Sequence, residues 1–318
     1  MKVALIGYGR WGKNLYNALN KLDNIDSVLV FDPIFEKIDT KLKTINFEEI
    51  ITNKDIKAVV ISSPSKTHFN YTKELLQNNK NVFCEKPLCF TSKEISELQN
   101  IISIKKNILV TGHTFLFNDS INYLKDLIAN KSLSFKTVSG KYSSFGTDIK
   151  DVDVLWDFGP HVLSIMNYLF DSAPIRSSIF PTSFREDGKV ESCFIHLDYE
   201  HPKVSVVFEL SWLNIDKKRE IEFNNYETLI RWDDLEPKKS IQVYEKQFKK
   251  EEIYGVFEHF HNIENNISIP FFTTREPIYN EMKYFIESIE KKEYKNIKSG
   301  IEFTSNIIKT LEYLSKKL

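Results

Sequence analysis

The chain opens with a short apolar run placed directly against a glycine-rich turn, and this feature constrains the fold most. Residues 3–6 are predicted to form a buried parallel strand, and residues 13–22 carry leucines at helical spacing. Gly7 permits a tight turn, Gly9 lets the backbone approach a pyrophosphate, and Gly12 lets helix and strand pack closely. An anion is then expected at the helix N-terminus. The spacing predicts a dinucleotide-binding turn.

An acidic residue ends the next predicted strand. That strand spans residues 27–31, and Asp32 follows it at about the 20-residue separation from the glycine turn that places an acid on the adenosine ribose. Its carboxylate accepts hydrogen bonds from ribose hydroxyls and repels a 2′-phosphate. The alternative is a turn without a ligand and a solvated Asp32. We favour NAD over NADP as the cofactor, with Tyr8, Arg10 and Trp11 of the same turn beside it, although a solvated surface Arg10 is an equally good interpretation.

Composition excludes several classes of protein. The 318 residues contain 43 basic and 44 acidic side chains, a formal charge of -1, so neither nucleic acid nor a membrane is an expected partner. No apolar run reaches the length of a membrane span, and Met1 leads straight into the first strand, so we expect a cytoplasmic protein. We expect no metal site. Cys84, Cys89 and Cys193 match no metal template, and His259 and His261 lack a third ligand.

The pattern of predicted elements changes along the chain. Strands near 2–6, 27–31, 58–62, 81–84 and 108–111 alternate with helices near 69–78 and 92–104, which predicts a parallel sheet in a domain of residues 1–118. Beyond it, several extended segments follow one another, after a helix near 119–129 and another beginning near Gly159. Residues 119–318 are therefore predicted to form an α+β domain with an open, largely antiparallel sheet, closed by helices near 276–291 and 299–317.

Four motifs follow one another along the chain: Gly7 to Gly12, the run Ser63-Pro64-Ser65 with His68 after it, Glu85-Lys86-Pro87, and Asp157-Phe-Gly-Pro-His161. Together they resemble the Gfo/Idh/MocA oxidoreductases. The resemblance covers nearly the whole chain, including Glu276-Pro277 with Glu281 and Phe285. It implies a Rossmann domain followed by an open-sheet domain that is often used for oligomerisation. It also implies oxidation or reduction of a hydroxyl or ketone on a sugar, cyclitol or sugar nucleotide.

Lys86 is the first candidate catalytic residue. It follows the predicted strand 82–85 at its carboxyl end, where ligands bind in open α/β sheets. A lysine there can donate to a substrate oxygen and stabilise developing negative charge, with Glu85 as an orienting partner or a structural acid. The alternative is a surface lysine paired with Glu85. We also expect Lys86 itself and Ser63, Pro64, His68 and Glu85 to lie near the cofactor, with His68 in a supporting role.

Asp157 and His161 are the second candidate catalytic pair. Their i, i+4 spacing places both on one helix face. With Asp157 as the N-cap, Pro160 falls where no intrahelical hydrogen bond is lost. His161 is then a general base whose pKa a nearby carboxylate raises. The alternative is a capping Asp157 and a packed His161. Tyr142 and Trp156 are candidate substrate-lining rings, though such rings often belong to a core.

These residues together predict an NAD-dependent dehydrogenase or ketoreductase acting on a sugar or sugar nucleotide. His161 takes the hydroxyl proton, Lys86 stabilises the oxygen and Asp157 orients both. The alternatives are an NAD-dependent glycoside hydrolase and a non-catalytic protein that senses NAD or sugar. Apolar strands such as 204–208 predict a homo-dimer or homo-tetramer assembled through the sheet faces.

Overall fold

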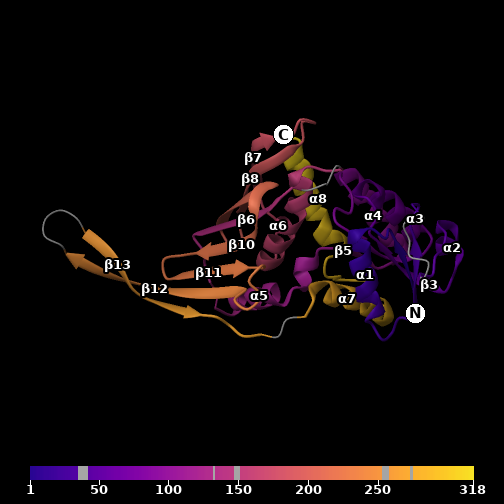
Figure 1. Ribbon diagram of the computed structural model, residues 1–318, viewed down its shortest axis with the longest axis horizontal. Coiled ribbons are helices and arrows are strands. Elements are labelled where there is room, and N and C mark those ends of the chain that lie inside the picture. Colours follow the sequence, from indigo (N-terminus) through magenta and orange to yellow (C-terminus); the bar gives the residue numbers. More distant parts are fainter. Residues whose placement is uncertain (35–41, 132, 147–150, 253–257, 273–274) are drawn as a thin grey trace.

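Two sheets with helices between them make up the molecule (Figure 1). The computed structural model describes residues 1–318 except 35–41, 132, 147–150, 253–257 and 273–274, and it describes no side chains for residue 131 or residues 247–266. The parallel sheet with α1–α4 lies at one end in Figure 1, and the larger sheet lies at the other.

The N-terminal sheet is parallel, and its strand order is β2-β1-β3-β4-β5. Its strands are buried on both faces, as their apolar runs require. Strand β2 lies on one side of β1, and β3 lies on the other, so the strand order reverses at β1. A crevice at the carboxyl ends of β1 and β3 is therefore the expected ligand position. The strands are β1 (Lys2–Ile6), β2 (Ser27–Phe31), β3 (Ile56–Ile61), β4 (Asn81–Glu85) and β5 (Leu109–Gly112).

Helices cover both faces of this sheet, and two of them, α2 and α4, begin at side-chain caps. The side chain of Thr91 accepts a hydrogen bond from the N–H of Glu94, and the Glu94 carboxylate accepts one from the N–H of Thr91. This reciprocal cap fixes the start of α4. The elements are α1 (Arg10–Asn20), α2 (Phe47–Thr52), the short 3-10 turn η2 (Ser65–Thr67), α3 (His68–Gln77) and α4 (Ser92–Lys105).

The second sheet has the order β13-β12-β11-β10-β6-β9-β8-β7. Every neighbouring pair is antiparallel except β6 and β9, so the predicted largely antiparallel sheet is confirmed. The strands are β6 (Thr137–Phe145), β7 (Arg176–Phe184), β8 (Val190–Tyr199), β9 (Val204–Ser211), β10 (Leu213–Asn224), β11 (Thr228–Asp233), β12 (Ile241–Glu252) and β13 (Glu258–Ser268).

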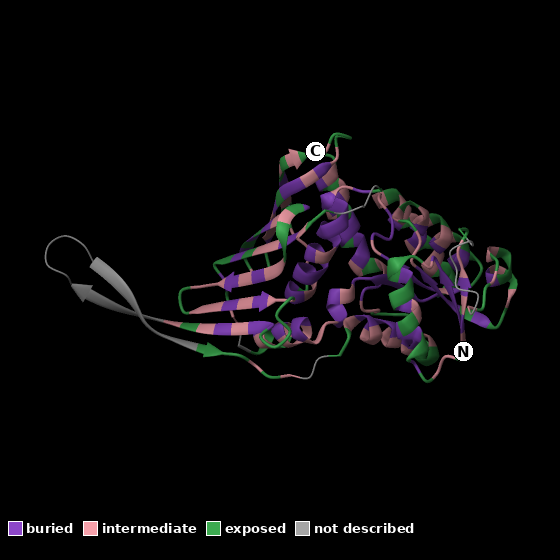
Figure 2. Ribbon diagram, in the orientation of Figure 1, coloured by how far each residue is buried: buried purple, intermediate pink, exposed green. Residues whose placement is uncertain are grey.

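One face of this sheet is packed and the other is open. Val206 and Phe208 of β9 are buried on the inner face, whereas Val207 between them is 40% exposed on the outer face. Helix α6 (Val154–Phe170) contacts β8 and β9 on the inner face, and almost all of its residues are buried (Figure 2). The 3-10 turn η3 (Thr114–Phe117) and α5 (Asp119–Lys131) pack beside it.

The start of α6 differs from the prediction. The helix begins at Val154 rather than near Gly159, and its N-cap is Asp153, whose carboxylate accepts a hydrogen bond from the N–H of Trp156. The predicted capping role of Asp157 is therefore wrong, since an earlier aspartate takes that position. Pro160 consequently lies inside the helix. The Asp157 carboxylate is left available for contacts outside its own helix.

Two closing helices join the sheets. Helix α7 (Pro277–Lys291) packs on α1. It also reaches β4, where the ring of Phe83 lies 6.0 Å from that of Phe285. Helix α8 (Ile301–Ser315) packs on both α4 and α6. A Cβ atom at Gly159 would lie 2.7 Å from Leu311 Cδ2, so this glycine permits the close approach of α6 and α8.

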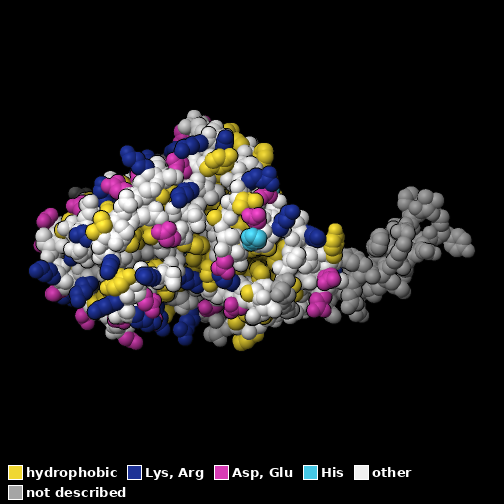
Figure 3. Space-filling view, turned by 180° about the vertical axis from the view of Figure 1, so that it is seen from behind, with side chains coloured by type: hydrophobic (Ala, Val, Ile, Leu, Met, Phe, Trp, Pro, Cys, Tyr) yellow, Lys and Arg dark blue, Asp and Glu magenta, His cyan; other side chains and the backbone are white. Residues whose placement is uncertain are grey.

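Basic and acidic side chains are mixed over the face seen in Figure 3. Among the described helices, none is long and apolar enough to cross a bilayer. All three cysteines are buried free thiols.

Candidate active site

The glycine turn has the geometry that its sequence predicts. Gly7 has a φ of 91°, and a Cβ there would lie 2.6 Å from the carbonyl oxygen of Ser62. A Cβ at Gly12 would lie 2.2 Å from the carbonyl oxygen of Gly7. By contrast, nothing lies within 4 Å of a Cβ at Gly9, so the loop is open to a ligand at that point. These three environments fit a tight turn, a helix contact and a pyrophosphate approach.

Asp32 lies against this turn. Its Oδ2 accepts a hydrogen bond of 2.8 Å from the N–H of Tyr8, and its Oδ1 accepts one of 2.9 Å from the N–H of Ile34. A carboxylate has about four acceptor positions, so both oxygens can still accept from a ribose. Tyr8 therefore contributes its backbone, while its ring packs edge-on to Tyr16 at 5.5 Å. Arg10 is exposed at the start of α1.

His68 connects two loops of the predicted cofactor site. Its Nε2 lies 2.9 Å from the carbonyl oxygen of Ser63, and its Nδ1 lies 2.8 Å from that of Pro87. Burial lowers the pKa of this histidine. The residue thus holds the loop after β3 against the loop after β4, and its place beside the cofactor stays a prediction. Pro64 lies exposed beside Ser63 at the start of η2.

Lys86 and Asp157 are brought together from distant parts of the chain. Lys86 Nζ donates to Asp157 Oδ1 at 2.9 Å and to the Asp157 carbonyl oxygen at 2.8 Å. The second carboxylate oxygen accepts from Trp212 Nε1 at 3.2 Å. An ammonium group has three donors, so one remains for a substrate oxygen. Asp157 therefore holds Lys86 in place, and Trp212 in turn holds Asp157.

His161 lies one helical turn from Asp157 but has different neighbours. Its ring stacks on Tyr142, with centroids 5.4 Å apart and planes 11° apart, and meets the edge of Phe115 at 5.3 Å. Within the described part of the chain, its buried Nδ1 has no hydrogen-bond partner. Trp156, the other candidate lining ring, packs on Phe90 instead.

The pKa of His161 is shifted opposite to the prediction. Burial lowers it well below the ordinary value, and the positive charges of Lys86 and Arg219 lower it further. The carboxylate of Asp157 does not raise it, because that carboxylate is committed to Lys86 and Trp212. The predicted elevation is therefore wrong. The imidazole is neutral near pH 7 and able to accept a proton.

Glu85 forms part of a buried acidic pair. It accepts hydrogen bonds from Trp11 Nε1 and, at 3.3 Å, from the N–H of Lys86. Burial raises its pKa to about 7. Burial and the charge of Glu85 also raise the pKa of Glu281 well above its usual value, and Thr114 Oγ1 donates to Glu281 at 3.0 Å. Glu85 thus links the glycine turn, through Trp11, to the backbone of the candidate catalytic lysine.

The sequence prediction missed several residues of this site. Trp212, Phe115 and Arg219 come from separate elements, and no local motif marks them. His113 was also missed: it is buried, and burial with the charge of Lys86 lowers its pKa to about 3. Only three-dimensional packing brings these groups together, because Phe115 lies in η3, Arg219 in β10, Trp212 between β9 and β10, and His113 between β5 and η3.

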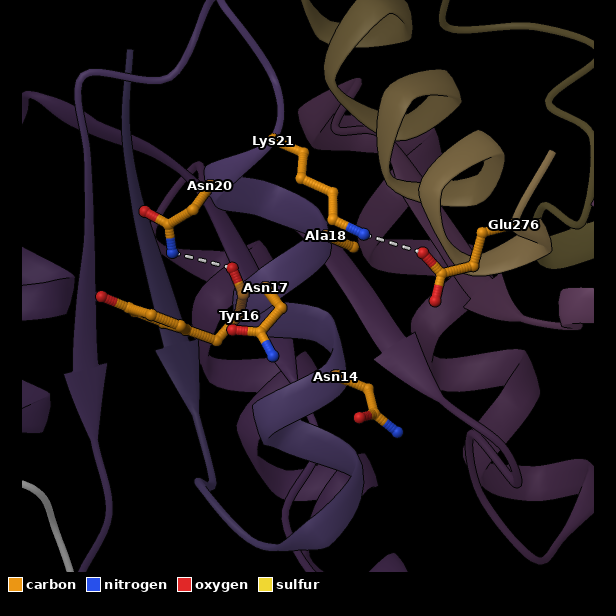
Figure 4. A pocket seen from close by; sticks show the side chains of 7 residues that line it. All are labelled: Asn14, Tyr16, Asn17, Ala18, Asn20, Lys21 and Glu276. Atoms are coloured by element: carbon orange, nitrogen blue, oxygen red, sulfur yellow. Dashed lines mark hydrogen bonds and ion pairs between the residues drawn. The ribbon is translucent and has the colours of Figure 1, made fainter.

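One cavity of the molecule lies away from the predicted catalytic residues. A cavity of about 400 Å³ lies between α1 and Glu276, where Lys21 Nζ reaches the Glu276 carboxylate at 3.0 Å (Figure 4). None of the predicted catalytic residues lines it. No group of three or more His, Cys, Asp or Glu side chains is placed to hold a metal ion in the described residues. The side chains of His259 and His261 lie outside the described residues.

Comparison with known proteins accords with this geometry. Residues 1–113 match the model of an oxidoreductase family with an NAD-binding Rossmann fold, named Gfo/Idh/MocA. Over these residues the chain is similar to the oxidoreductases of that family. An uncharacterized oxidoreductase of Streptococcus pneumoniae is 25% identical over 133 residues, which are 40% of this chain and 36% of that protein. The chain thus aligns with about a third of that relative's length.

Two further proteins align with more of the chain. The scyllo-inositol 2-dehydrogenase (NADP(+)) IolW of Bacillus subtilis is 23% identical over 65% of this chain and 62% of its own length. The structure of UDP-N-acetylglucosamine 3-dehydrogenase GnnA from Acidithiobacillus ferrooxidans superposes with a TM-score of 0.79 at 14% identity, covering 99% of this chain and 96% of that one. The superposition shows that the fold extends over both sheets.

Proposed function

We propose that this protein is an NAD-dependent dehydrogenase or ketoreductase that transfers hydride between nicotinamide and a hydroxyl or keto carbon of a sugar or sugar nucleotide. The contact between Lys86 and Asp157 carries the proposal. It holds an ammonium group at the carboxyl end of β4, beside His161 and on the ligand side of the parallel sheet. The sugar-related activities named for the inositol dehydrogenase and GnnA support the substrate class.

The residues present fit a dinucleotide. Gly7, Gly9 and Gly12 supply the turn, and Asp32 supplies acceptors for the ribose hydroxyls. A bound nicotinamide would supply the hydride acceptor or donor. Because a carboxylate repels a 2′-phosphate, we propose NAD rather than NADP, although a relative's name specifies NADP(+).

The protein side chains divide the acid-base work. In the oxidative direction, the neutral ring of His161 accepts the hydroxyl proton, and we assign this to Nε2 because Nδ1 is buried. The remaining donor of Lys86 stabilises the substrate oxygen as negative charge develops on it. Asp157 keeps Lys86 oriented toward that oxygen.

We further propose a homo-dimer or homo-tetramer formed through the open face of the large sheet. Phe180 and Phe194 are directly paired on neighbouring strands and are 60% and 40% exposed, and Val207 lies close by on β9. Light scattering at micromolar concentration tests this, and a monomer would contradict it.

A direct assay tests the function. Purified protein would be mixed with NAD or NADP and with panels of free sugars, cyclitols and nucleotide sugars, and the absorbance of reduced nicotinamide followed. We expect turnover with at least one sugar-derived alcohol. Release of an aglycone without net reduced nicotinamide would instead identify the glycoside hydrolase. Cofactor binding with no turnover in any panel would favour the sensor.

A further inference from the structure

Arg219 lies on the inner face of the large sheet, close to the proposed catalytic histidine. Strand β10 pairs with β6 so that Arg219 lies opposite Tyr142. The guanidinium carbon is 5.3 Å from the centre of the Tyr142 ring and 5.8 Å from that of Phe115. The same two rings pack on His161. Arg219 and His161 therefore belong to one aromatic-lined group of side chains.

The guanidinium of Arg219 is anchored, yet most of its donors are not used. Nη1 donates to Asp234 Oδ2 at 2.8 Å, and Asn118 holds the other carboxylate oxygen of Asp234 at 3.2 Å. Nε is buried with no acceptor in the described chain. Arginine has five N–H donors in a rigid fork, so a fixed orientation with unused donors is suited to binding an anion.

Arg231 on the neighbouring strand shows the contrast. It directs Nε and Nη2 to the same oxygen of Glu222, at 2.9 and 2.6 Å. It lies on the outer face, because the alternate residues Ile230 and Trp232 are buried on the inner one. Arg231 is thus a surface ion pair, and it provides a matched control for Arg219.

Positive charge predominates around Arg219. Lys217 lies two residues earlier, and its pKa is lowered by burial and then by the charge of Arg219, with Asp234 acting in the opposite direction. On the other side of His161, the ammonium of Lys86 is matched by Asp157. The two charged side chains that act on His161, Lys86 and Arg219, are both positive, which favours an anionic ligand beside that ring.

We propose that Arg219 binds an anionic group carried by the sugar that reacts, so that the substrate is a sugar acid or sugar phosphate rather than a neutral polyol. The inference rests on the proposed function, which assigns the reacting carbon to Lys86 and His161. Carboxylate and phosphate both accept two parallel hydrogen bonds from a guanidinium. Because Arg219 shares its ring neighbours with His161, the anion belongs on the reacting sugar ring and not at the far end of a nucleotide.

Matched sugar sets test this binding without requiring turnover. The protein saturated with NADH would be titrated by calorimetry with a hexose, its hexuronate and its 6-phosphate, in the gluco, galacto and manno configurations. In at least one set, we expect an anionic member to bind about tenfold or more tightly than the neutral hexose. The uronate and phosphate arms identify which anion is recognised.

Variants then test whether Arg219 causes the preference for the anionic sugar over the neutral hexose. Arg219→Gln should remove it while leaving NADH affinity unchanged, Arg219→Lys should retain part of it, and Arg231→Gln should leave it intact. The neutral hexose is an internal reference, so a general loss of folding is not mistaken for loss of anion binding. Equal or better binding of neutral hexoses by the wild-type protein, or no binding of any member, would overturn the inference. Arg219-dependent binding of an anionic sugar with no hydride transfer in the activity panels would uphold it and refute the proposed dehydrogenase.

Discussion

The proposed cofactor side and the proposed substrate side of the site are built in different ways. The cofactor side uses one continuous stretch, because Gly7, Gly12 and Asp32 all lie within the first βαβ unit. The substrate side joins Lys86 of the loop after β4 to Asp157 of α6, 71 residues away, and Asp157 to Trp212, a further 55 residues away. A local motif can therefore specify the first side, while only the packing of two sheets specifies the second.

The largest effect expected from this division is on turnover. Lys86→Met should lower the turnover rate by about a hundredfold or more, since it removes the group that stabilises the substrate oxygen. Affinity for NAD should stay close to the wild-type value, because Lys86 does not contact the glycine turn. Stopped-flow kinetics and fluorescence titration measure the two quantities. Lys93→Met, at an exposed position of α4, is the control. Activity retained within a few fold would place the chemistry elsewhere.

Asp157→Asn should have a smaller effect. Losing the charge-assisted hydrogen bond to Lys86 should reduce kcat/KM by roughly ten- to a hundredfold. Because no hydrogen bond joins Asp157 to His161, the acid limb of the pH–rate profile should remain where it is in the wild-type protein. A shift of that limb to lower pH would restore the view that Asp157 acts on the histidine.

Asp32→Ser tests the cofactor side alone. It should narrow the preference for NAD over NADP by about tenfold, or 1.4 kcal/mol, since it removes the charge that repels a 2′-phosphate. Turnover at saturating cofactor should be nearly unchanged. Calorimetric titration with both cofactors gives the ratio, and Asp23→Ser, exposed in the turn after α1, serves as the reference variant. Equal affinities in the wild-type protein would refute the assignment of NAD.

The smallest expected effect is on the stability of the folded protein, through the buried pair Glu85 and Glu281. The pKa values of Glu281 and Glu85 are raised in the folded protein, Glu85 to about 7, from an ordinary value of 4.5. The folded state therefore binds protons that the unfolded state has released. Their contribution to stability is fully present below about pH 4.5 and is lost as pH rises through the folded pKa values.

Glu281→Gln should remove part of the stability loss that occurs as pH rises. The variant should match the wild-type protein near pH 5 and be more stable by about 1 kcal/mol near pH 8, because it has no buried carboxyl at that position to ionise. Urea unfolding at both pH values measures this difference. Glu287→Gln, on the exposed side of α7 between Lys283 and Lys291, should show no such pH-dependent gain. A variant whose stability relative to the wild-type protein is the same near pH 5 and near pH 8 would show that folding does not raise the pKa of Glu281.

The sequence predicted the parallel sheet well because each of its elements carries a local signal. The bounds of β1 and β2 agree with the predicted strands 2–6 and 27–31, and α4 begins at Ser92, as predicted. The start of α6 was missed because two aspartates, Asp153 and Asp157, can each cap a helix and only tertiary contacts choose between them. The direction of the pKa shift of His161 was predicted wrongly for a related reason. Burial and the positive charges of Lys86 and Arg219 lower this pKa, and neither effect is encoded in the i, i+4 spacing.

Trp11 gives the molecule an optical property that follows from its position. Of the four tryptophans, Trp156, Trp212 and Trp232 are at most 7% exposed, whereas Trp11 is 43% exposed on the first turn of α1. Its indole donates to Glu85, so it lies between the glycine turn and the residue that precedes Lys86. Its emission is therefore the one among the four most open to quenching by solvent and by a ligand at the turn. The protein carries its own fluorophore on the cofactor side, and binding there can be followed without an added label.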